Sequence, residues 1–217
     1  MNFLESIRKF FKKLWFIIWK DNSLKGWILS LVIIFIFIKF IFFPILSVAT
    51  GTSLPLAIVE SCSMYHSNDI FSNFNLWYQR HEIKYSSLNI SEQQFSKFSL
   101  TNGFSKGDIL FVTGVKPQNI KIGDVIIFNS LVQSTPVIHR VINITYENGT
   151  YFFSTEGDNN NGQLQEPYSN VDETHINQNQ IIGKANFILV PYIGWIKLVF
   201  YESQNPDKGF CTETPSA

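Results

Sequence analysis

The chain has 217 residues, which leaves room for about one domain besides a membrane segment, and its 17 basic and 17 acidic side chains cancel. Nucleic-acid binding is not expected, because it depends on a concentrated basic face, and beyond the first 40 residues acidic side chains outnumber basic ones. The 2 cysteines, Cys62 and Cys211, are too few for a disulfide framework and match no zinc-ligand spacing, and we expect them to stay unpaired.

Residues 1–26 form a basic segment. In residues 3–19 apolar side chains recur at helical spacing, which predicts an amphipathic helix lying on the cytoplasmic face of a membrane. An unstructured basic tail is the alternative, and a second membrane pass is disfavoured because charges interrupt the apolar pattern. The charges opposite the apolar side chains are Arg8, Lys9, Lys12 and Lys13.

Residues 27–48 are predicted to be a transmembrane anchor. The run from Trp27 to Leu46 is almost wholly apolar, and roughly 20 helical residues span the hydrocarbon core of a bilayer. Lys39 lies near one end of the run, where its amine reaches the headgroups. A cleavable signal peptide is the alternative, but this run is too long and begins too late. Lysine enrichment on the N-terminal side predicts a cytoplasmic N-terminus and an external body at the cell membrane.

Residues 49–203 are predicted to form a mainly β ectodomain. Short apolar runs separated by turn signals, among them the hairpin pair Asn148-Gly149, predict a compact antiparallel fold. Residues 191–201 are expected to pack as a further core strand. The five runs that indicate strands are 107–112, 124–129, 137–146, 150–155 and 181–190.

Two segments of the body depart from this pattern. Residues 67–104 form a polar insertion with a short helix expected around residues 91–98, where Ser91 is suited to begin it. Residues 204–217 are expected to be a disordered tail.

Candidate catalytic residues follow the anchor directly. Ser61 and Ser63 flank Cys62, and a serine attacks an amide only when a base takes its proton and donors hold the oxyanion. Among the histidines, His139 lies in a strand-like apolar run, and Asp158 follows another strand, where a carboxylate is suited to orient an imidazole. No metal or cofactor is expected, because the other histidines lie in polar loops: His66, His81 and His175.

In this order the blocks resemble signal peptidase I, in the archaeal and endoplasmic-reticulum branch where histidine replaces the general-base lysine of bacterial enzymes. The resemblance implies a β-rich catalytic core, secretory preproteins bound as extended strands, and cleavage after Ala-x-Ala through an acyl-enzyme. It also implies contact with the lipid bilayer and with a protein-export translocon. The blocks are Ser61-Cys62-Ser63-Met64, Gly107-Asp-Ile-Leu-Phe-Val, Gly123-Asp-Val-Ile-Ile-Phe, Pro136-Val-Ile-His-Arg-Val, Thr155-Glu-Gly-Asp-Asn-Asn and Ile182-Gly-Lys with Pro191-Tyr-Ile-Gly.

The resemblance assigns a role to each matching position. Ser63 corresponds to the nucleophile, and its N–H together with the Ser61 hydroxyl corresponds to the oxyanion hole. His139 corresponds to the general base of the serine endopeptidase. Asp158 corresponds to an acidic position that the family requires.

Three departures from the family pattern leave alternatives open. Cys62 stands for a glycine, His66 for a proline, and Leu164 for a second aspartate that is the expected triad acid. The acid is therefore open among Asp158, Glu166 and Asp172, and a Ser–His dyad is also compatible. A catalytically silent, membrane-tethered β-domain that binds extended peptides or partner subunits is the competing function, and a peptidase dedicated to one surface or pilus protein is a third.

Overall fold

A computed structural model describes residues 3–67, 74–130, 135–165, 169, 171–201 and 209–214. The chain divides into two compact units, Met1–Ala49 and Thr50–Ala217, and each is described by itself.

The first unit consists of helices. A long apolar helix, Leu24–Thr50, comprises α2 (Leu24–Phe37), a π-helical turn (Ile38–Phe42) and α3 (Phe43–Thr50). Within the described part of the chain it is the one helix long and apolar enough to cross a membrane. The wide turn precedes Pro44, which has no N–H to donate to the preceding turn.

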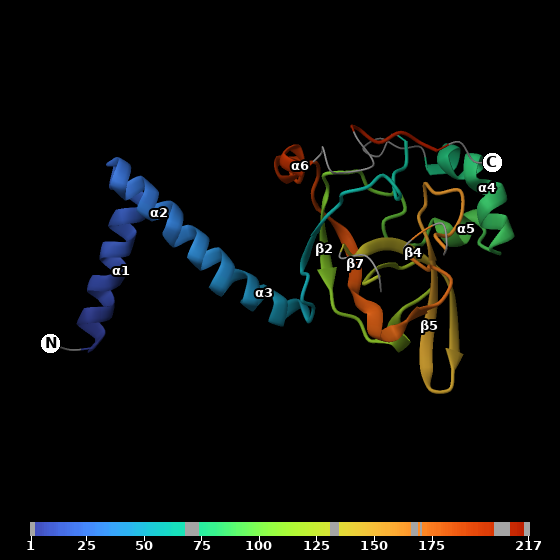
Figure 1. The fold of residues 1–217 in the computed structure, drawn as a ribbon, viewed down its shortest axis with the longest axis horizontal. Coiled ribbons are helices and arrows are strands. Elements are labelled where there is room, and N and C mark those ends of the chain that lie inside the picture. Colours follow the sequence, from blue (N-terminus) through green and yellow to red (C-terminus); the bar gives the residue numbers. More distant parts are fainter. Residues whose placement is uncertain are drawn as a thin grey trace. The chain divides into compact units, whose positions relative to one another are not determined.

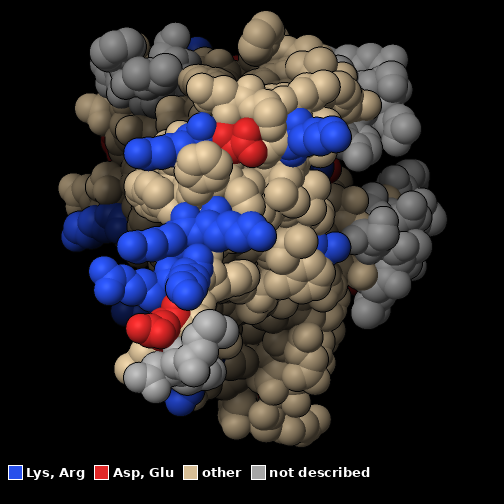
Figure 2. All heavy atoms as spheres, turned by 90° about the vertical axis from the view of Figure 1, so that its left-hand side faces the viewer, with Lys and Arg blue, Asp and Glu red and all other residues tan. Residues whose placement is uncertain are grey.

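Helix α1 (Phe3–Trp19) precedes this apolar helix, and the spacing of residues 3–19 predicts it correctly. Its basic residues are exposed to solvent. Figure 2 shows several Lys and Arg side chains close together on the face that it presents. The exposed basic side chains of α1 are Arg8, Lys9, Lys12 and Lys13.

The second unit is built on one seven-stranded sheet with the order β1-β2-β7-β3-β4-β5-β6, in which every neighbouring pair is antiparallel (Figure 1). The predicted β-rich antiparallel fold is therefore confirmed. The strands are β1 (Leu56–Ile58), β2 (Ile109–Thr113), β3 (Val125–Phe128), β4 (Val137–Glu147), β5 (Thr150–Glu156), β6 (Ile176–Asn177) and β7 (Ile181–Val190). Two 3₁₀ turns complete the connections, Pro117–Asn119 and Gln178–Gln180.

Strand β3 lies at the centre of the core and is buried on both faces. Side chains alternate across a strand, so Val125 and Ile127 enter one apolar cluster with Met64 and Leu110. Ile126 and Phe128 enter a second cluster on the opposite face, together with residues of β4 and β5. A continuous apolar run is the expected sequence for such a strand.

The insertion folds into two helices, α4 (Phe74–Ser87) and α5 (Glu92–Phe95). Ser91 caps α5 as expected, because its side chain accepts from the Gln94 N–H and the Gln94 side chain accepts from the Ser91 N–H. Helix α4 is not predicted by the sequence. The insertion is held on the sheet by an apolar, mostly aromatic cluster that includes Trp77, Tyr78, Tyr85, Ile90, Phe95 and Ile142 of β4.

Segment 191–201 contains a turn followed by a helix, α6 (Trp195–Tyr201), and the expectation of a further strand is wrong. Tyr192 has a φ of 57°, which ends the extended conformation of β7. From there Gly194 and Leu198 are buried while the residues between them are more exposed, a helical and not an alternating pattern.

The C-terminal tail departs from the expectation of disorder, at least over residues 209–214, the described part of it. Cys211 forms a disulfide with Cys62, so the prediction that both cysteines stay unpaired is also wrong. Residues 149 positions apart are brought together by the fold, a proximity that spacing along the chain does not reveal.

Candidate active site

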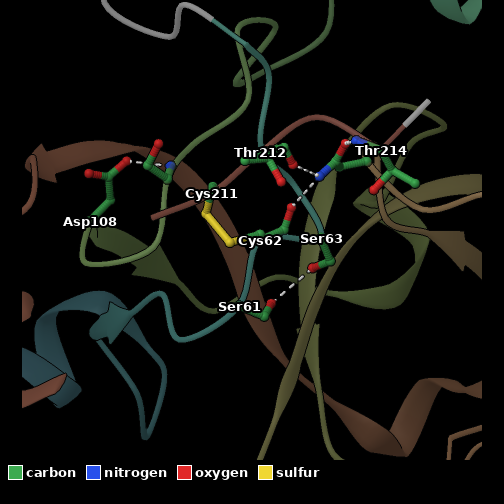
Figure 3. Close-up of a disulfide and its surroundings, with 9 residues drawn as sticks. Ser61, Cys62, Ser63, Asp108, Cys211, Thr212 and Thr214 are labelled. Carbon is green, nitrogen blue, oxygen red and sulfur yellow. Dashed lines mark hydrogen bonds between the residues drawn. A yellow bond between two sulfur atoms is a disulfide. The ribbon is translucent and has the colours of Figure 1, made fainter. Parts of the chain in front are cut away.

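Ser61 and Ser63 lie in a tight loop after β1, and their hydroxyl oxygens are 3.1 Å apart (Figure 3). The loop is anchored by the side chain of Met64, which is 1% exposed and packs in the apolar core against the sheet. Its main chain is bound on both sides, because the Met64 carbonyl accepts from Phe104 N–H at 3.0 Å and the Ser63 carbonyl accepts from Asn159 N–H at 2.8 Å. We call residues 61–64 the serine loop.

The residues that follow β5 lie directly against the serine loop. A side chain at Gly157 would come within 2.7 Å of the Ser63 carbonyl oxygen, so only glycine permits this approach. Asn159 adds a side-chain hydrogen bond to the Cys62 carbonyl at 3.0 Å. Residues 157–160, which we call the β5 loop, therefore hold the main chain of the serine loop in position through close packing and hydrogen bonds.

His139 lies on β4, is 3% exposed, and its Nδ1 is hydrogen-bonded to the carboxylate of Glu173. Glu173 is fully buried and also accepts from the Thr155 hydroxyl at 2.8 Å and from the Leu164 N–H at 2.8 Å. Because a carboxylate accepts, Nδ1 is the donor and Nε2 carries the free electron pair. The bond to Glu173 therefore orients the imidazole ring and, in the neutral form of the ring, places the basic electron pair on Nε2.

Asp158 does not contact His139. Its carboxylate accepts from Arg140 Nη2 at 2.7 Å and from Tyr85 at 3.0 Å, and it pairs with His66 Nε2 at 2.9 Å. His139 and Arg140 are neighbours on β4 and point to opposite faces, so a carboxylate that binds Arg140 is on the wrong side for His139. The expectation that Asp158 is the acid beside His139 is corrected on this ground.

The network around Asp158 is buried and charged. Burial opposes ionisation of Asp158, but the charge of Arg140 and the hydrogen bonds from His66 and Arg140 together outweigh it and hold the pKa of that carboxyl far below its usual range. Burial lowers the pKa of His66, which stacks on Trp77 of α4 with ring centroids 3.5 Å apart, and burial raises the pKa of Tyr85. The network joins β4, the β5 loop and the insertion.

Lys84 of α4 fixes the β5 loop from the side of the insertion. Its amine donates to the carbonyl oxygens of Gly157 and Asn160, both at 2.8 Å, and to that of Asp158 at 3.2 Å. The same amine lies 2.9 Å from the carboxylate of Glu156, whose pKa burial raises. A single side chain of the insertion thus binds most of the loop that supports the serine loop.

Ser63 and His139 both lie near the C-terminal end of β5. The β4–β5 register ends at the pair Arg140–Glu156, and His139 and Gly157 are the residues next to that pair on the two chains. A Cβ built on Gly157 would lie 2.7 Å from the Ser63 carbonyl oxygen. In the described residues the Ser63 hydroxyl is hydrogen-bonded to Ser61 and His139 to Glu173, with no hydrogen bond between Ser63 and His139. Catalytic hydrogen bonds are often long before substrate binds.

The other candidate acids do not reach His139 or lie outside the described residues. Asp172 faces solvent and accepts from the N–H and hydroxyl of Thr174. Glu166 lies outside the described residues. Asp172 is among the acids that the sequence leaves open, but its neighbour Glu173 is not. Side chains alternate in direction along an extended segment, so the residue next to an exposed Asp172 is expected to point inward, and this is the signal available for Glu173.

No family model matches the chain. It is similar to proteins named signal peptidase complex catalytic subunit: SEC11C of Homo sapiens (29% identical over 102 residues), sec11 of Dictyostelium discoideum (29% over 105) and SEC11 of Lodderomyces elongisporus (26% over 106). These matches cover 46%, 48% and 49% of this chain and 52%, 57% and 63% of the relatives. The chain therefore spans roughly half to three fifths of their length, and the resemblance to signal peptidases stated from the sequence is confirmed.

Proposed function

We propose that the chain is a membrane-anchored serine endopeptidase that removes signal peptides from exported preproteins. The observation that carries the proposal is the His139–Glu173 pair, set beside the end of β5 against which the serine loop is held. The names of the relatives, which are catalytic subunits of signal peptidase complexes, support the same reaction.

In the proposed mechanism the Ser63 hydroxyl turns from Ser61 toward His139 when a preprotein binds. Nε2 of His139 takes the proton as Oγ attacks the scissile carbonyl, and Glu173 stabilises the imidazolium that forms. The oxyanion is held by the Ser63 N–H and the Ser61 hydroxyl. The proton then passes to the leaving amine, and water releases the acyl group by the same steps.

The Ser61 hydroxyl is suited to this second role. Its oxygen lies 3.1 Å from Ser63 Oγ in the resting loop, close to where charge develops. Once the Ser63 oxygen has bonded to the substrate carbon, the Ser61 O–H is free to donate to the oxyanion. A donor of this kind typically contributes about 10²–10³-fold to kcat.

The substrate in this proposal is an extended segment with small side chains at the first and third positions before the cut, of the Ala-x-Ala type. An extended chain satisfies its backbone groups by pairing with the exposed backbone of the catalytic sheet. A protein-export translocon is the proposed source of these segments.

The proposed location is the outer side of the cell membrane for the second unit and the cytoplasm for α1. The exposed basic residues of α1 lie N-terminal to the apolar helix Leu24–Thr50, which favours a cytoplasmic N-terminus. The disulfide between Cys62 and Cys211 independently favours an oxidising compartment for the second unit, since such bonds are rare in the cytosol.

The test is incubation of the purified full chain in detergent with a secretory precursor, followed by mass determination of the products. The proposal expects one cut directly after the Ala-x-Ala motif and loss of that cut when the last alanine is replaced by leucine. Precursor that binds but stays intact would instead establish the silent peptide-binding domain.

A further inference from the structure

Residues 209–214, which we call the C-terminal brace, lie against the serine loop. Cys211 is bonded through its sulfur to Cys62, the residue between Ser61 and Ser63 (Figure 3). The backbone of the two serines is thereby joined covalently to a segment far along the chain. The mechanism above assigns this linkage no role.

Asn159 makes a second connection between the brace and the serine loop. Its side-chain amide donates to the carbonyl oxygens of Cys62 and Thr212, both at 3.0 Å, and its side-chain oxygen accepts from Thr214 N–H at 2.7 Å. Its own N–H donates to the Ser63 carbonyl at 2.8 Å. Asn159 is 5% exposed, and both ends of its side-chain amide and its backbone N–H are hydrogen-bonded inside the protein.

Two other side chains of the brace make contacts, Glu213, which is largely buried, and Phe210, which is 83% exposed. Glu213 lies 3.1 Å from Arg80 and 3.7 Å from His81, both on α4, and the Phe210 ring packs against Trp195 of α6 with centroids 5.3 Å apart. The brace is thus attached to α4 by ion pairs and to the β5 loop by hydrogen bonds. The disulfide transfers that fixed position to the serine loop.

We propose that Cys211 and Asn159 are positioning residues for catalysis, and that the Cys62–Cys211 disulfide holds Ser61 and Ser63 at the position that proton transfer to His139 requires. This inference rests on the proposed function. Neither residue touches the reacting atoms. Both act through the main chain of the serine loop, so their removal affects kcat more than KM.

The test compares the full chain in detergent before and after dithiothreitol, which reduces the disulfide to two thiols and is itself oxidised to its cyclic disulfide. Since the chain has 2 cysteines, no other bond within it is reduced. We expect kcat to fall about 10- to 100-fold with KM within about twofold, because small misplacement of a reacting group has effects of that size. Reoxidation restores kcat. The Cys211→Ser variant shows the low kcat from the start and does not respond to dithiothreitol.

Two further measurements keep the inference falsifiable. Asn159→Asp retains the disulfide and the side-chain shape but loses the donor to both carbonyls, and we expect a lowered kcat without a matching rise in KM. Hydrogen exchange of residues 61–65 and 159 reports on the serine loop without any substrate, and we expect faster exchange after reduction. If reduced protein cleaves with unchanged kcat and the Ser63→Ala variant does not cleave, the inference is overturned and the proposed function stands. If neither oxidised nor reduced protein cleaves the precursor, the proposed function fails. If hydrogen exchange of the serine loop is unchanged on reduction, the disulfide does not hold that loop, whatever the result of the cleavage assay.

Discussion

Glu173 binds His139 from a segment that also binds Leu164, the position at which the resemblance places a second aspartate. The Glu173 carboxylate accepts from the Leu164 N–H, and the Leu164 carbonyl accepts from the Glu173 N–H at 2.9 Å. The carboxylate therefore comes from the chain that lies beside position 164 and not from position 164 itself. A Ser–His–acid arrangement remains available although leucine occupies that position.

Glu173→Gln is expected to lower kcat by about 10⁴-fold, since an amide in place of the carboxylate no longer fixes the tautomer of His139 or stabilises its charge. The measurement is steady-state cleavage of the precursor by full-length protein. Asp172→Asn is the matched control. Asp172 is the residue next to Glu173, but its carboxylate faces solvent and is hydrogen-bonded to Thr174. Equal loss in both variants would show that Glu173 has no special relationship to His139.

Asp158→Asn is expected to destabilise the second unit by about 3–5 kcal/mol, because it leaves the buried guanidinium of Arg140 without its counter-charge. Urea denaturation in detergent, followed by tryptophan fluorescence, gives the free energy of unfolding. Glu147→Gln, at an exposed position on β4, is the control and should change it by less than about 0.5 kcal/mol. A stability loss no larger than that of the control would mean that the Arg140–Asp158 pair is not formed.

Stability should fall as the pH drops below about 6.5, the ordinary pKa of histidine. Burial lowers the pKa of His66 in the folded chain, so below that pH the unfolded chain binds more protons and is favoured. His81 contributes with the same sign, because burial also lowers its pKa. A second loss begins below about pH 3.9, where Asp158 of the unfolded chain takes up a proton first.

His66→Gln isolates the first of these effects, because glutamine keeps a donor toward Asp158 and does not titrate. The free energy of unfolding of this variant should depend less on pH between about 5 and 6.5 than that of the wild type. Identical slopes for the two proteins in that range would show that His66 does not carry the effect.

Lys84→Met is expected to lower the free energy of unfolding by about 1–3 kcal/mol, since carbonyl groups of the β5 loop lose their donor. We also expect a lower kcat, because that loop supports Ser63. Lys97→Met changes an exposed lysine of the same insertion and should leave both quantities unchanged. Wild-type stability in the Lys84 variant would contradict a supporting role for the insertion.

The sheet was predictable because its strands carry strong local signals. Strand β3 is a continuous apolar run between turn residues, and the Asn148-Gly149 turn, with φ values of 49° and 84°, joins β4 to β5 as expected. The strands β1 and β6 were missed because 3 and 2 residues are too few for a periodic pattern.

The site was predictable only in part, because the residues that contact its side chains are distant in the sequence and are brought together only by folding. His139 was singled out by its strand-like surroundings, but the partner of its Nδ1 depends on which face of β4 it occupies, and the sequence does not show which acid lies opposite. The linkage of Cys62 to Cys211 and the contact of Lys84 with the β5 loop are likewise contacts between distant segments. A helix with mixed polar and aromatic residues, such as α4, also lacks a clear apolar period.

The central claim is that the Ser63 hydroxyl is the nucleophile that His139 activates. Its most direct test is kcat for precursor cleavage by Ser63→Ala and His139→Ala, each purified as the full chain and checked for folding by its urea transition. We predict no detectable Ala-x-Ala cleavage by either variant, with folding retained. Cleavage at the same bond and at a wild-type rate by either folded variant would contradict the account.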